Sequence, residues 1–581
     1  MKDIFFCISK KHILNTGSLS LIKSNGGYLC FSENRFENDK YVVLLYGDIY
    51  ETAPYHEIII KNYELHAEQM FSEINGDFGI ILYDKKCGCF IAGRDKFGVK
   101  SLYYYKDENT VAVSNRIHSF FKYLPIRKIP NERKNLLYVG SHYRHIDAIA
   151  EDTFYSGITA IKQGHYIKSE KDSLTSSPYW RLEILDLSRK TRQDIENEYL
   201  SILRNSIRRR LLKSTNPAFM VSSGMDSSGI AALASEILND KVNLFTTVFA
   251  EDTEYNEAKE IEPVAAKIGK SWNKLTIDPR GIVEDVVGIL KEADEPFYTV
   301  TQLMHYYLAK EVSTRGFDTL FGGLGGDEAN CGEIEEYLFF FADLKLLGEE
   351  SLMVEHMRGW VKYHGHPLYP KSYDTAHEYF KKHINFGLHG ESLLDLDRYN
   401  KYFFVFNRDY ADSHYITPKL EHPYKSYLLN KLYQDLYSEV IPCVLKAEEF
   451  NLNKFRLKGR MPYFDSNVMQ YGFSIPILMK YKNGCNKAVL REAMKWILPD
   501  STINNCMKKG WNAPFNEWLK VFLKDKAIEM LNNSTQRQKA IYNIGEIKKL
   551  LQEHLTGICN HMMFFWQFLN YEMWYNINID R

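Results

Sequence analysis

The sequence has no run of about 18 apolar residues, the length that a membrane-spanning helix needs. Its first residues, 1–7, also lack the long apolar stretch of a secretory signal peptide. We therefore expect a cytoplasmic protein with no membrane partner.

Cysteine is scarce as well, because the nine cysteines are scattered and contain no CxxC pair. Such a set excludes a disulfide-rich scaffold and a zinc site with paired ligands, and it is typical of a reducing compartment. We interpret Cys87 and Cys89, the two closest, as half-buried thiols in a turn. Excess charge is missing too, since 73 basic and 74 acidic residues nearly cancel, so we expect no nucleic-acid partner.

The sequence does contain many aromatic residues, including 40 Tyr and 34 Phe, which argues against disorder. Its 581 residues are too many for one core, so several domains are expected. Residues 1–125 hold short β-branched and aromatic segments, such as 41–46 and 78–83, that turn residues separate. They predict a first domain of stacked antiparallel sheets, and residues 126–190 are expected to connect it to the rest.

Residues 191–581 have a different pattern, in which short apolar strands alternate with helices. Strands are expected near 218–221, 242–249 and 273–277, and a mainly helical region over 332–440. This alternation predicts a parallel, doubly wound sheet. The expected fold class is thus an α+β N-terminal domain followed by an α/β C-terminal domain with a parallel sheet and many helices.

A small-residue loop directly follows the first of these strands and precedes a helix. Such a loop lets backbone N–H groups and a helix N-terminus approach phosphate oxygens, while its aspartate can hold Mg²⁺. A plain serine-rich helix cap explains the loop equally well when it is taken alone. The loop consists of Ser222, Ser223, Gly224, Met225, Asp226, Ser227 and Ser228.

A second strand, near 319–321, ends in a glycine-rich loop that contains Gly322, Gly323 and Asp327. Glycines are needed where a backbone comes close to a ligand. Because ligands bind beyond the carboxyl ends of parallel strands, we expect both loops at one site. ATP and Mg²⁺ are the predicted cofactors, and Asp226 and Asp327 the predicted metal ligands.

With these two loops, the sequence resembles the asparagine synthetase-like enzymes. The loop at 222–227 is similar to their Ser-Gly-Gly-x-Asp-Ser, with Ser223 at the first glycine. Further segments resemble the family in order along the chain. They are 294–296, 325–328, 460–465, 487–493, 507–511 and 565–574. The resemblance implies an enzyme that forms AMP and pyrophosphate, and it implies that Val248 contacts the adenine through its backbone.

Segments 46–50, 74–78 and 94–104 look like the glutaminase domain of the same family. A working glutaminase of this kind needs a cysteine directly after the initiator methionine, and here Lys2 stands there. Cys7 is the nearest thiol, but we place it in a strand. We also find no counterpart of the family's Arg-Gly-Pro-Asp loop. We therefore expect a degenerate glutaminase domain that does not hydrolyse glutamine.

The acceptor side also departs from asparagine synthetases, which have a glutamate where this chain has Leu324. A leucine cannot accept a proton from ammonia. Relatives that lost the glutaminase and changed this position include β-lactam synthetases, which use a tyrosine, and lasso-peptide cyclases. We favour the cyclase-like interpretation, in which an amine of the same substrate attacks the activated carboxylate.

The resemblance implies roles for three further residues. Lys508 matches the lysine that stabilises the oxyanion and the pyrophosphate, with Lys509 as its neighbouring alternative. Glu448 or Glu449 could serve in a base dyad, although one of the two could simply be solvated.

The substrate of such a cyclase would be a short peptide, delivered by a processing partner protein. Two alternatives remain beside it. One is an asparagine synthetase that uses free ammonia, and the other is an inactive scaffold that binds a nucleotide or a partner protein.

Overall fold

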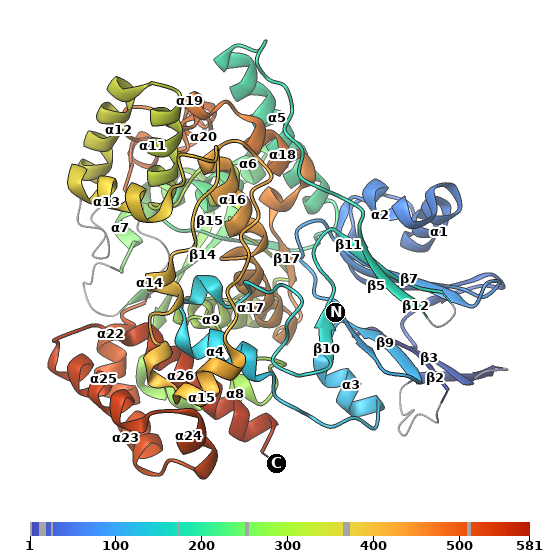
Figure 1. The fold of residues 1–581 in the computed structure, drawn as a ribbon. Helices are drawn as coiled ribbons and strands as arrows, with labels where there is room; N and C mark the ends of the chain where they lie inside the picture. The colour runs from blue at the N-terminus through green and yellow to red at the C-terminus, as the bar shows by residue number, and fades with distance from the viewer. Residues whose placement is uncertain are drawn as a thin grey trace.

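The computed structural model describes residues 3–10, 19–24, 27–170, 173–249, 255–363, 372–507 and 513–580. The chain forms two parts that lie side by side, with the N-terminal sheets at one end and a larger, mostly helical part at the other (Figure 1). Within the residues described, no helix is both long and apolar enough to cross a membrane.

Two six-stranded antiparallel sheets form the N-terminal part, in the orders β10-β8-β9-β1-β3-β2 and β12-β11-β7-β6-β5-β4. The sheets pack face to face, and Phe6 of one lies against Phe90 of the other with ring centroids 5.0 Å apart. The predicted stacked antiparallel sheets are confirmed. The strands are β1 (Phe5–Ser9), β2 (Leu19–Ser24), β3 (Gly27–Ser32), β4 (Phe36–Glu37), β5 (Tyr41–Ile49), β6 (Gly76–Asp84), β7 (Cys89–Arg94), β8 (Tyr103–Lys106), β9 (Thr110–Ser114), β10 (Ile158–Ala160), β11 (His165–Glu170) and β12 (Ser173–Pro178).

These sheets extend beyond residue 125, where we placed the end of the first domain. β10 pairs with β8, and β11 pairs with β7, although both lie within the expected connecting region 126–190. The buried Ile158 and Ile167 complete the apolar faces that the earlier strands begin. The connecting region therefore contributes three strands to the N-terminal sheets, of which β10 and β12 lie at sheet edges.

The turn between β6 and β7 holds a disulfide between Cys87 and Cys89. Our interpretation of these residues as two thiols is wrong. A second disulfide joins Cys485 and Cys506 in the C-terminal part. Both pairings come from chain folding that the spacing of the cysteines does not reveal.

A five-stranded parallel sheet forms the centre of the C-terminal part, as predicted, in the order β15-β14-β13-β16-β17. Its strands are β13 (Pro217–Met220), β14 (Val242–Phe249), β15 (Gly269–Ile277), β16 (Thr319–Phe321) and β17 (Lys458–Arg460). The chain moves outward from β13 in one direction to β14 and β15, and later in the other direction to β16. The order of strands thus reverses at β13 and β16, where open α/β sheets bind ligands.

Helices cover both faces of this sheet. α6 and α7 pack against each other and against strands of the sheet. α9 and α17 form a second pair that does the same. The early helices are α1 (Tyr55–His66), α2 (Met70–Glu73), α3 (Ile117–Tyr123), α4 (Glu132–Gly140), α5 (Arg192–Leu211), α6 (Met225–Leu238), α7 (Ala258–Ile268), α8 (Ile282–Leu290) and α9 (Val300–Thr314). α5 begins at Arg192, because Thr191 and Asp194 form a capping box at its first turn.

The region predicted as mainly helical is helical, and helices continue to the C-terminus. They are α10 (Gly326–Asn330), α11 (Glu336–Leu346), α12 (Glu350–Tyr363), α13 (Tyr373–His383), α14 (Leu396–Tyr399), α15 (Arg408–His414), α16 (Tyr427–Tyr437), α17 (Ile441–Lys454), α18 (Ser466–Ser474), α19 (Ile477–Lys480), α20 (Ala488–Ala493), α21 (Asp500–Ile503), α22 (Phe515–Trp518), α23 (Lys524–Asn532), α24 (Gln536–Ile541), α25 (Ile544–Thr556) and α26 (Met562–Asn578).

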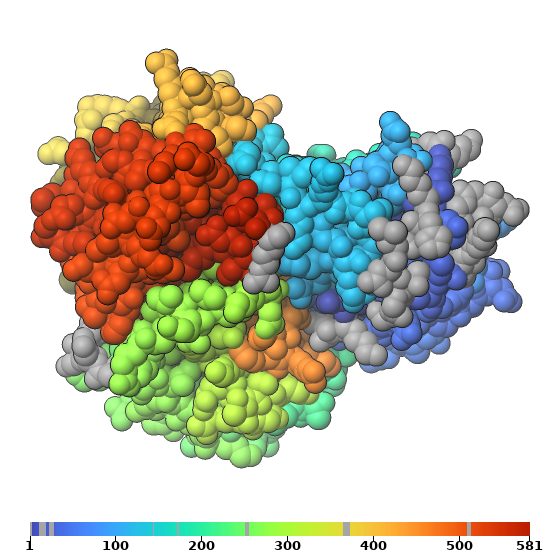
Figure 2. All heavy atoms as spheres, turned by 90° about the horizontal axis from the view of Figure 1, so that it is seen from below, coloured from blue at the N-terminus to red at the C-terminus, as the bar shows by residue number. Residues whose placement is uncertain are grey.

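The two parts share one hydrophobic cluster, which includes Phe5 and Phe120 as well as Trp566 and Trp574 of α26. In Figure 2 the C-terminal helices, in red, lie directly beside the cyan segment that follows the first strands. Ion pairs of buried arginines reinforce this contact. They include Arg210 with Asp77, at 3.4 Å, and Arg460 with Asp48, at 2.9 Å. The N-terminal sheets are therefore held firmly on the parallel-sheet domain.

Candidate active site

The first loop connects β13 to α6 and is ordered by its own serines. Ser222 N–H donates to Ser227 Oγ at 3.0 Å, and Ser228 Oγ donates to the Ser222 carbonyl at 2.9 Å. The Ser223 N–H donates to a Glu257 carboxylate oxygen at 3.0 Å. The Ser223 N–H, just before the N-cap of α6, thus already binds an anionic oxygen, the kind of group that a phosphate-binding loop receives.

The second loop connects β16 to α10 and lies against the first. A Cβ at Gly323 would come 2.6 Å from the Ser227 nitrogen, and one at Gly326 would come 2.4 Å from Asp226 Cγ. Gly325 has a φ of +86°, which favours glycine. Only glycines allow the two loops to approach this closely.

Both predicted metal ligands contact one lysine. Asp226 lies in the first turn of α6 and Asp327 in the first turn of α10. Lys487 Nζ donates to Asp226 Oδ2, and to Asp327 Oδ1 at 2.5 Å. Lys487 is buried, with 5% of its side chain exposed, at the start of α20. The reversal point of the sheet therefore holds two carboxylates and a cation in contact.

Residues 487–493 resemble a family segment, but the sequence alone assigns no role to Lys487. The structure adds it to the site, because α20 brings it across 160 residues of chain to Asp327. The sequence does contain a signal for this role, because Lys487 directly precedes an apolar helix start. A lysine buried at such a helix end has no solvent to satisfy its charge. Such a lysine needs carboxylate partners.

The two carboxylates fit a magnesium ion that also binds phosphates. Among the described residues no group of three or more His, Cys, Asp or Glu could hold a metal by itself. Mg²⁺ is commonly bound by one or two carboxylates together with phosphate oxygens and water. Lys487 Nζ between Asp226 and Asp327 shows that this position suits a cation. The donor set thus agrees with Mg²⁺ bound together with a nucleotide.

Glu328, the neighbour of Asp327, is buried with 4% exposure. Its burial and the adjacent Asp327 charge raise the pKa of Glu328 well above its usual value.

Comparison with known proteins decides the family. The asparagine synthase family model matches residues 198–576, which is more than half of the chain. The chain belongs to the asparagine synthase family. As a member it is an ATP-dependent ligase, and the predictions of enzyme class and of ATP use are confirmed. A second family model, the glutamine amidotransferase domain, matches residues 39–180.

Several curated proteins resemble this asparagine synthase family member over most of its length. Asparagine synthetase [glutamine-hydrolyzing] 1 of Bacillus subtilis is 22% identical and covers 94% of the chain and 87% of its own length. Amidase chry2 of Gibberella zeae is also 22% identical, with coverages of 87% and 78%. Amidase chyE of Penicillium rubens is 23% identical, with coverages of 80% and 73%.

The N-terminal part of this family member keeps the amidotransferase fold but not an accessible thiol. Cys7 is fully buried in β1 opposite Cys30 of β3. Burial, and then the nearby Cys30, raises the pKa of the Cys7 thiol well above its usual value. A neutral thiol inside a sheet is a poor nucleophile. Lys2 lies outside the described residues.

The two predicted base candidates, adjacent in α17, point to different places, and both are buried. Glu448 binds His305 Nδ1 at 2.8 Å. The Glu449 oxygens accept the Ser101 N–H of the N-terminal domain at 3.2 and 3.1 Å. The idea that one of the two is solvated is wrong. Glu449 also lines an interdomain cavity of about 530 Å³ that includes Tyr46.

Two other predicted residues complete the comparison with the sequence. Val248 lies near the carboxyl end of β14, beside β13, so its backbone is at the same edge of the sheet as the two loops. Lys508 falls outside the described residues, as does Lys509. The predicted roles of Val248 and Lys508 therefore remain predictions.

Proposed function

We propose that this ligase activates a substrate carboxylate as its adenylate and joins it to an amine of the same molecule, as a macrolactam-forming peptide cyclase does. Leu324 carries the proposal. It lies in the second loop between Gly323 and Asp327 and packs against the main hydrophobic core. It cannot take a proton from attacking ammonia, and it adds an apolar wall to the acceptor side.

The nucleotide site supports the first half-reaction. In the proposal, the phosphates of ATP lie over the first loop, where the N–H groups at the start of α6 receive their oxygens. Asp226 and Asp327 hold Mg²⁺, which neutralises phosphate charge when it is bound. Lys487 turns from the two carboxylates toward the pyrophosphate, whose charge it stabilises as the carboxylate attacks the α-phosphorus.

The second half-reaction depends on position more than on acid–base chemistry. Holding an amine beside the adenylate replaces a bimolecular step by an intramolecular one, which contributes up to about 7–11 kcal/mol. We propose Lys508 for the oxyanion. For the base we propose Glu449, because it lines the interdomain cavity, although both of its oxygens also accept the Ser101 N–H.

The substrate that fits this proposal is a short peptide with an internal Asp or Glu and a free N-terminus, delivered by a processing partner protein. The N-terminal domain then serves as a structural or partner-binding module. The relatives include both an asparagine synthetase and amidases at nearly equal identity, so similarity alone does not choose the acceptor. A cytoplasmic location stays a prediction.

The test is pyrophosphate release from ATP and Mg²⁺, measured with added compounds one at a time. They are aspartate with ammonia, aspartate with glutamine, and leaderless peptides that carry an internal Asp or Glu. The proposal predicts release with a peptide alone, together with a peptide product that has lost one water. The matched control is the same peptide with a blocked N-terminus. It lacks the attacking amine, so it should remain linear and should not lose water.

Two other outcomes would replace the proposal. Release with aspartate and ammonia, and none with peptides, would identify an ammonia-using asparagine synthetase with an unusual apolar acceptor site. Nucleotide binding without release under any addition would identify a scaffold.

A further inference from the structure

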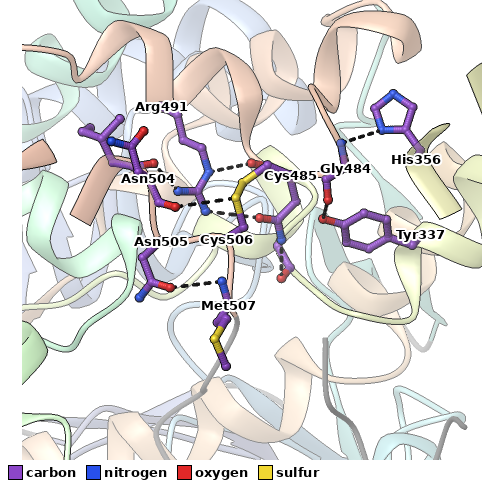
Figure 3. The surroundings of a disulfide bond; sticks show 12 residues. Tyr337, His356, Gly484, Cys485, Arg491, Asn504, Asn505, Cys506 and Met507 are labelled. Carbon is purple, nitrogen blue, oxygen red and sulfur yellow. Dashed lines mark hydrogen bonds between the residues drawn. A yellow bond between two sulfur atoms is a disulfide. The ribbon is translucent and has the colours of Figure 1, made fainter. Parts of the chain in front are cut away.

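The disulfide between Cys485 and Cys506 has one firmly fixed end. Cys485 closes the turn 482–485, whose backbone is held from two helices. Tyr337 Oη of α11 donates to the Gly484 carbonyl at 3.0 Å, and the Gly484 N–H donates to His356 Nδ1 of α12 at 3.3 Å (Figure 3). Cys506 lies beyond α21 and is only partly buried. The bond therefore attaches a surface segment to a rigid turn.

A second tie runs parallel to the disulfide. Arg491 of α20 donates through Nε to the Asn486 carbonyl at 2.8 Å, and through a terminal nitrogen to the Ile503 carbonyl at 2.6 Å. It thus connects the residue after Cys485 to a residue shortly before Cys506, and Figure 3 shows Arg491 beside the disulfide. The noncovalent tie and the covalent one hold the same two segments together.

These segments adjoin the carboxylate–lysine contact directly. Lys487 is two residues from Cys485, and the intervening Asn486 donates to the Gly332 carbonyl at 3.0 Å. The Gly332 N–H donates to the backbone carbonyl of Asp327 at 3.0 Å. A Cβ at Gly332 would lie 2.5 Å from Lys487 Cε, so the fit is tight. Any movement of the 485–487 backbone therefore shifts Lys487 relative to Asp327.

We propose that the Cys485–Cys506 disulfide is a redox-responsive tether that holds the backbone of Lys487 in place beside the nucleotide site at Asp226 and Asp327. A cross-link between residues 21 apart restricts the enclosed loop, and its loss increases the freedom of that loop. This inference rests on the proposed function, because it assigns a regulatory device to the same nucleotide site.

The chemical step is thiol–disulfide exchange with a small dithiol. A thiolate of the dithiol attacks Cys506 Sγ, the more accessible sulfur, and the S–S bond breaks with Cys485 as the leaving thiolate. The second thiol of the reagent then closes its own disulfide and releases Cys506. Two electrons and two protons pass from the dithiol to the two cysteines.

The experiment measures the affinity of Mg²⁺ with ATP by calorimetry on the full chain, before and after treatment with a dithiol. The background variant Cys87→Ser/Cys89→Ser leaves the Cys485–Cys506 bond as the only disulfide among the described residues. We expect reduction to weaken binding by about threefold to tenfold, because the site loses preorganisation. Amide hydrogen exchange over 486–507 should become faster at the same time.

The matched variant is Cys506→Ser in the same background. It should bind Mg²⁺ with ATP as weakly as the reduced protein and should not respond to the dithiol. Should it fail to fold, alkylation of the reduced protein provides the same comparison. Equal affinity and equal exchange in the two redox states would overturn the inference, as would recovery of Cys485 and Cys506 as free thiols from oxidised protein.

The two proposals fail in distinguishable ways. A protein whose nucleotide affinity responds to the dithiol, but which releases no pyrophosphate with any acceptor, keeps the tether and loses the proposed function. A protein that releases pyrophosphate with a peptide at the same nucleotide affinity in both redox states keeps the function and loses the tether.

Discussion

Two regions of this protein descend from catalytic folds, and they differ in how their polar groups are used. At the carboxyl end of the parallel sheet, Lys487 contacts both Asp226 and Asp327, the predicted metal ligands. In the N-terminal sheets, Cys7 is buried. There the Tyr46 hydroxyl accepts a hydrogen bond from Asn453 Nδ2 at 2.5 Å, across the domain interface.

The difference separates a candidate reaction site from an interface between domains. An active site needs charged groups that remain able to bind something else, and the parallel sheet retains such groups. The N-terminal polar groups instead bind the neighbouring domain, so they stabilise an interface. We therefore expect mutations in the two regions to affect different quantities.

The largest effect is expected at the carboxylates. Asp327→Asn removes a negative charge from the nucleotide site, and we expect pyrophosphate release to fall by at least about a hundredfold, or about 3 kcal/mol. Steady-state release with the active acceptor measures it. The control is Asp278→Asn, an equal change at an exposed side chain that pairs with Arg280. Full activity of Asp327→Asn would remove this residue from the mechanism.

The next effect concerns stability at the domain interface. Arg210→Met leaves Asp77 buried without its arginine, and the free energy of unfolding should fall by about 3–5 kcal/mol. Urea unfolding followed by tryptophan fluorescence measures the change. Arg280→Met, at an exposed ion pair, is the control and should change little. A stable Arg210→Met variant would contradict the structural role of this interface.

Nucleotide binding should stabilise one region selectively. With ATP and Mg²⁺ at about a hundred times Kd, the protein should gain about 2.7 kcal/mol of stability, and chelation of Mg²⁺ with EDTA should remove most of it. Hydrogen exchange should show protection at the loops 222–228 and 322–327, and little in the N-terminal sheets. Protection that is unaffected by EDTA would argue against Asp226 and Asp327 as metal ligands.

The smallest effect is expected at Cys7. Cys7→Ala should change pyrophosphate release by less than about twofold, because a buried neutral thiol takes no part in the reaction. Glutamate release from glutamine should be absent in both the wild type and the variant. Glutamate release that disappears with Cys7→Ala would show that the N-terminal domain is still a glutaminase.

Much of the fold could be predicted because its signals are local. The strand, small-residue loop and helix at 218–234 follow one another directly, and so do those at 319–330. A parallel sheet then requires the two loops to share an edge. At that edge of the sheet, Asp226 and Asp327 both contact Lys487 in the structure.

The features that sequence reasoning missed depend on distant parts of the chain. β10 to β12 join the first sheets after a helical interruption, so their pattern suggested a connector. Lys487 reaches its partners only because α20 packs against α5 and α10. The Cys485–Cys506 bond spans two short helices, and no spacing rule indicates such a pair.

The most direct test of the central claim follows an oxygen atom. The substrate whose carboxylate supports pyrophosphate release is labelled with oxygen-18 in that carboxylate. The products are then analysed by mass spectrometry. If the nucleotide site built on Asp226, Asp327 and Lys487 adenylates a carboxylate, one labelled oxygen must appear in AMP. Label found in inorganic phosphate with formation of ADP, or unlabelled AMP, would contradict this account.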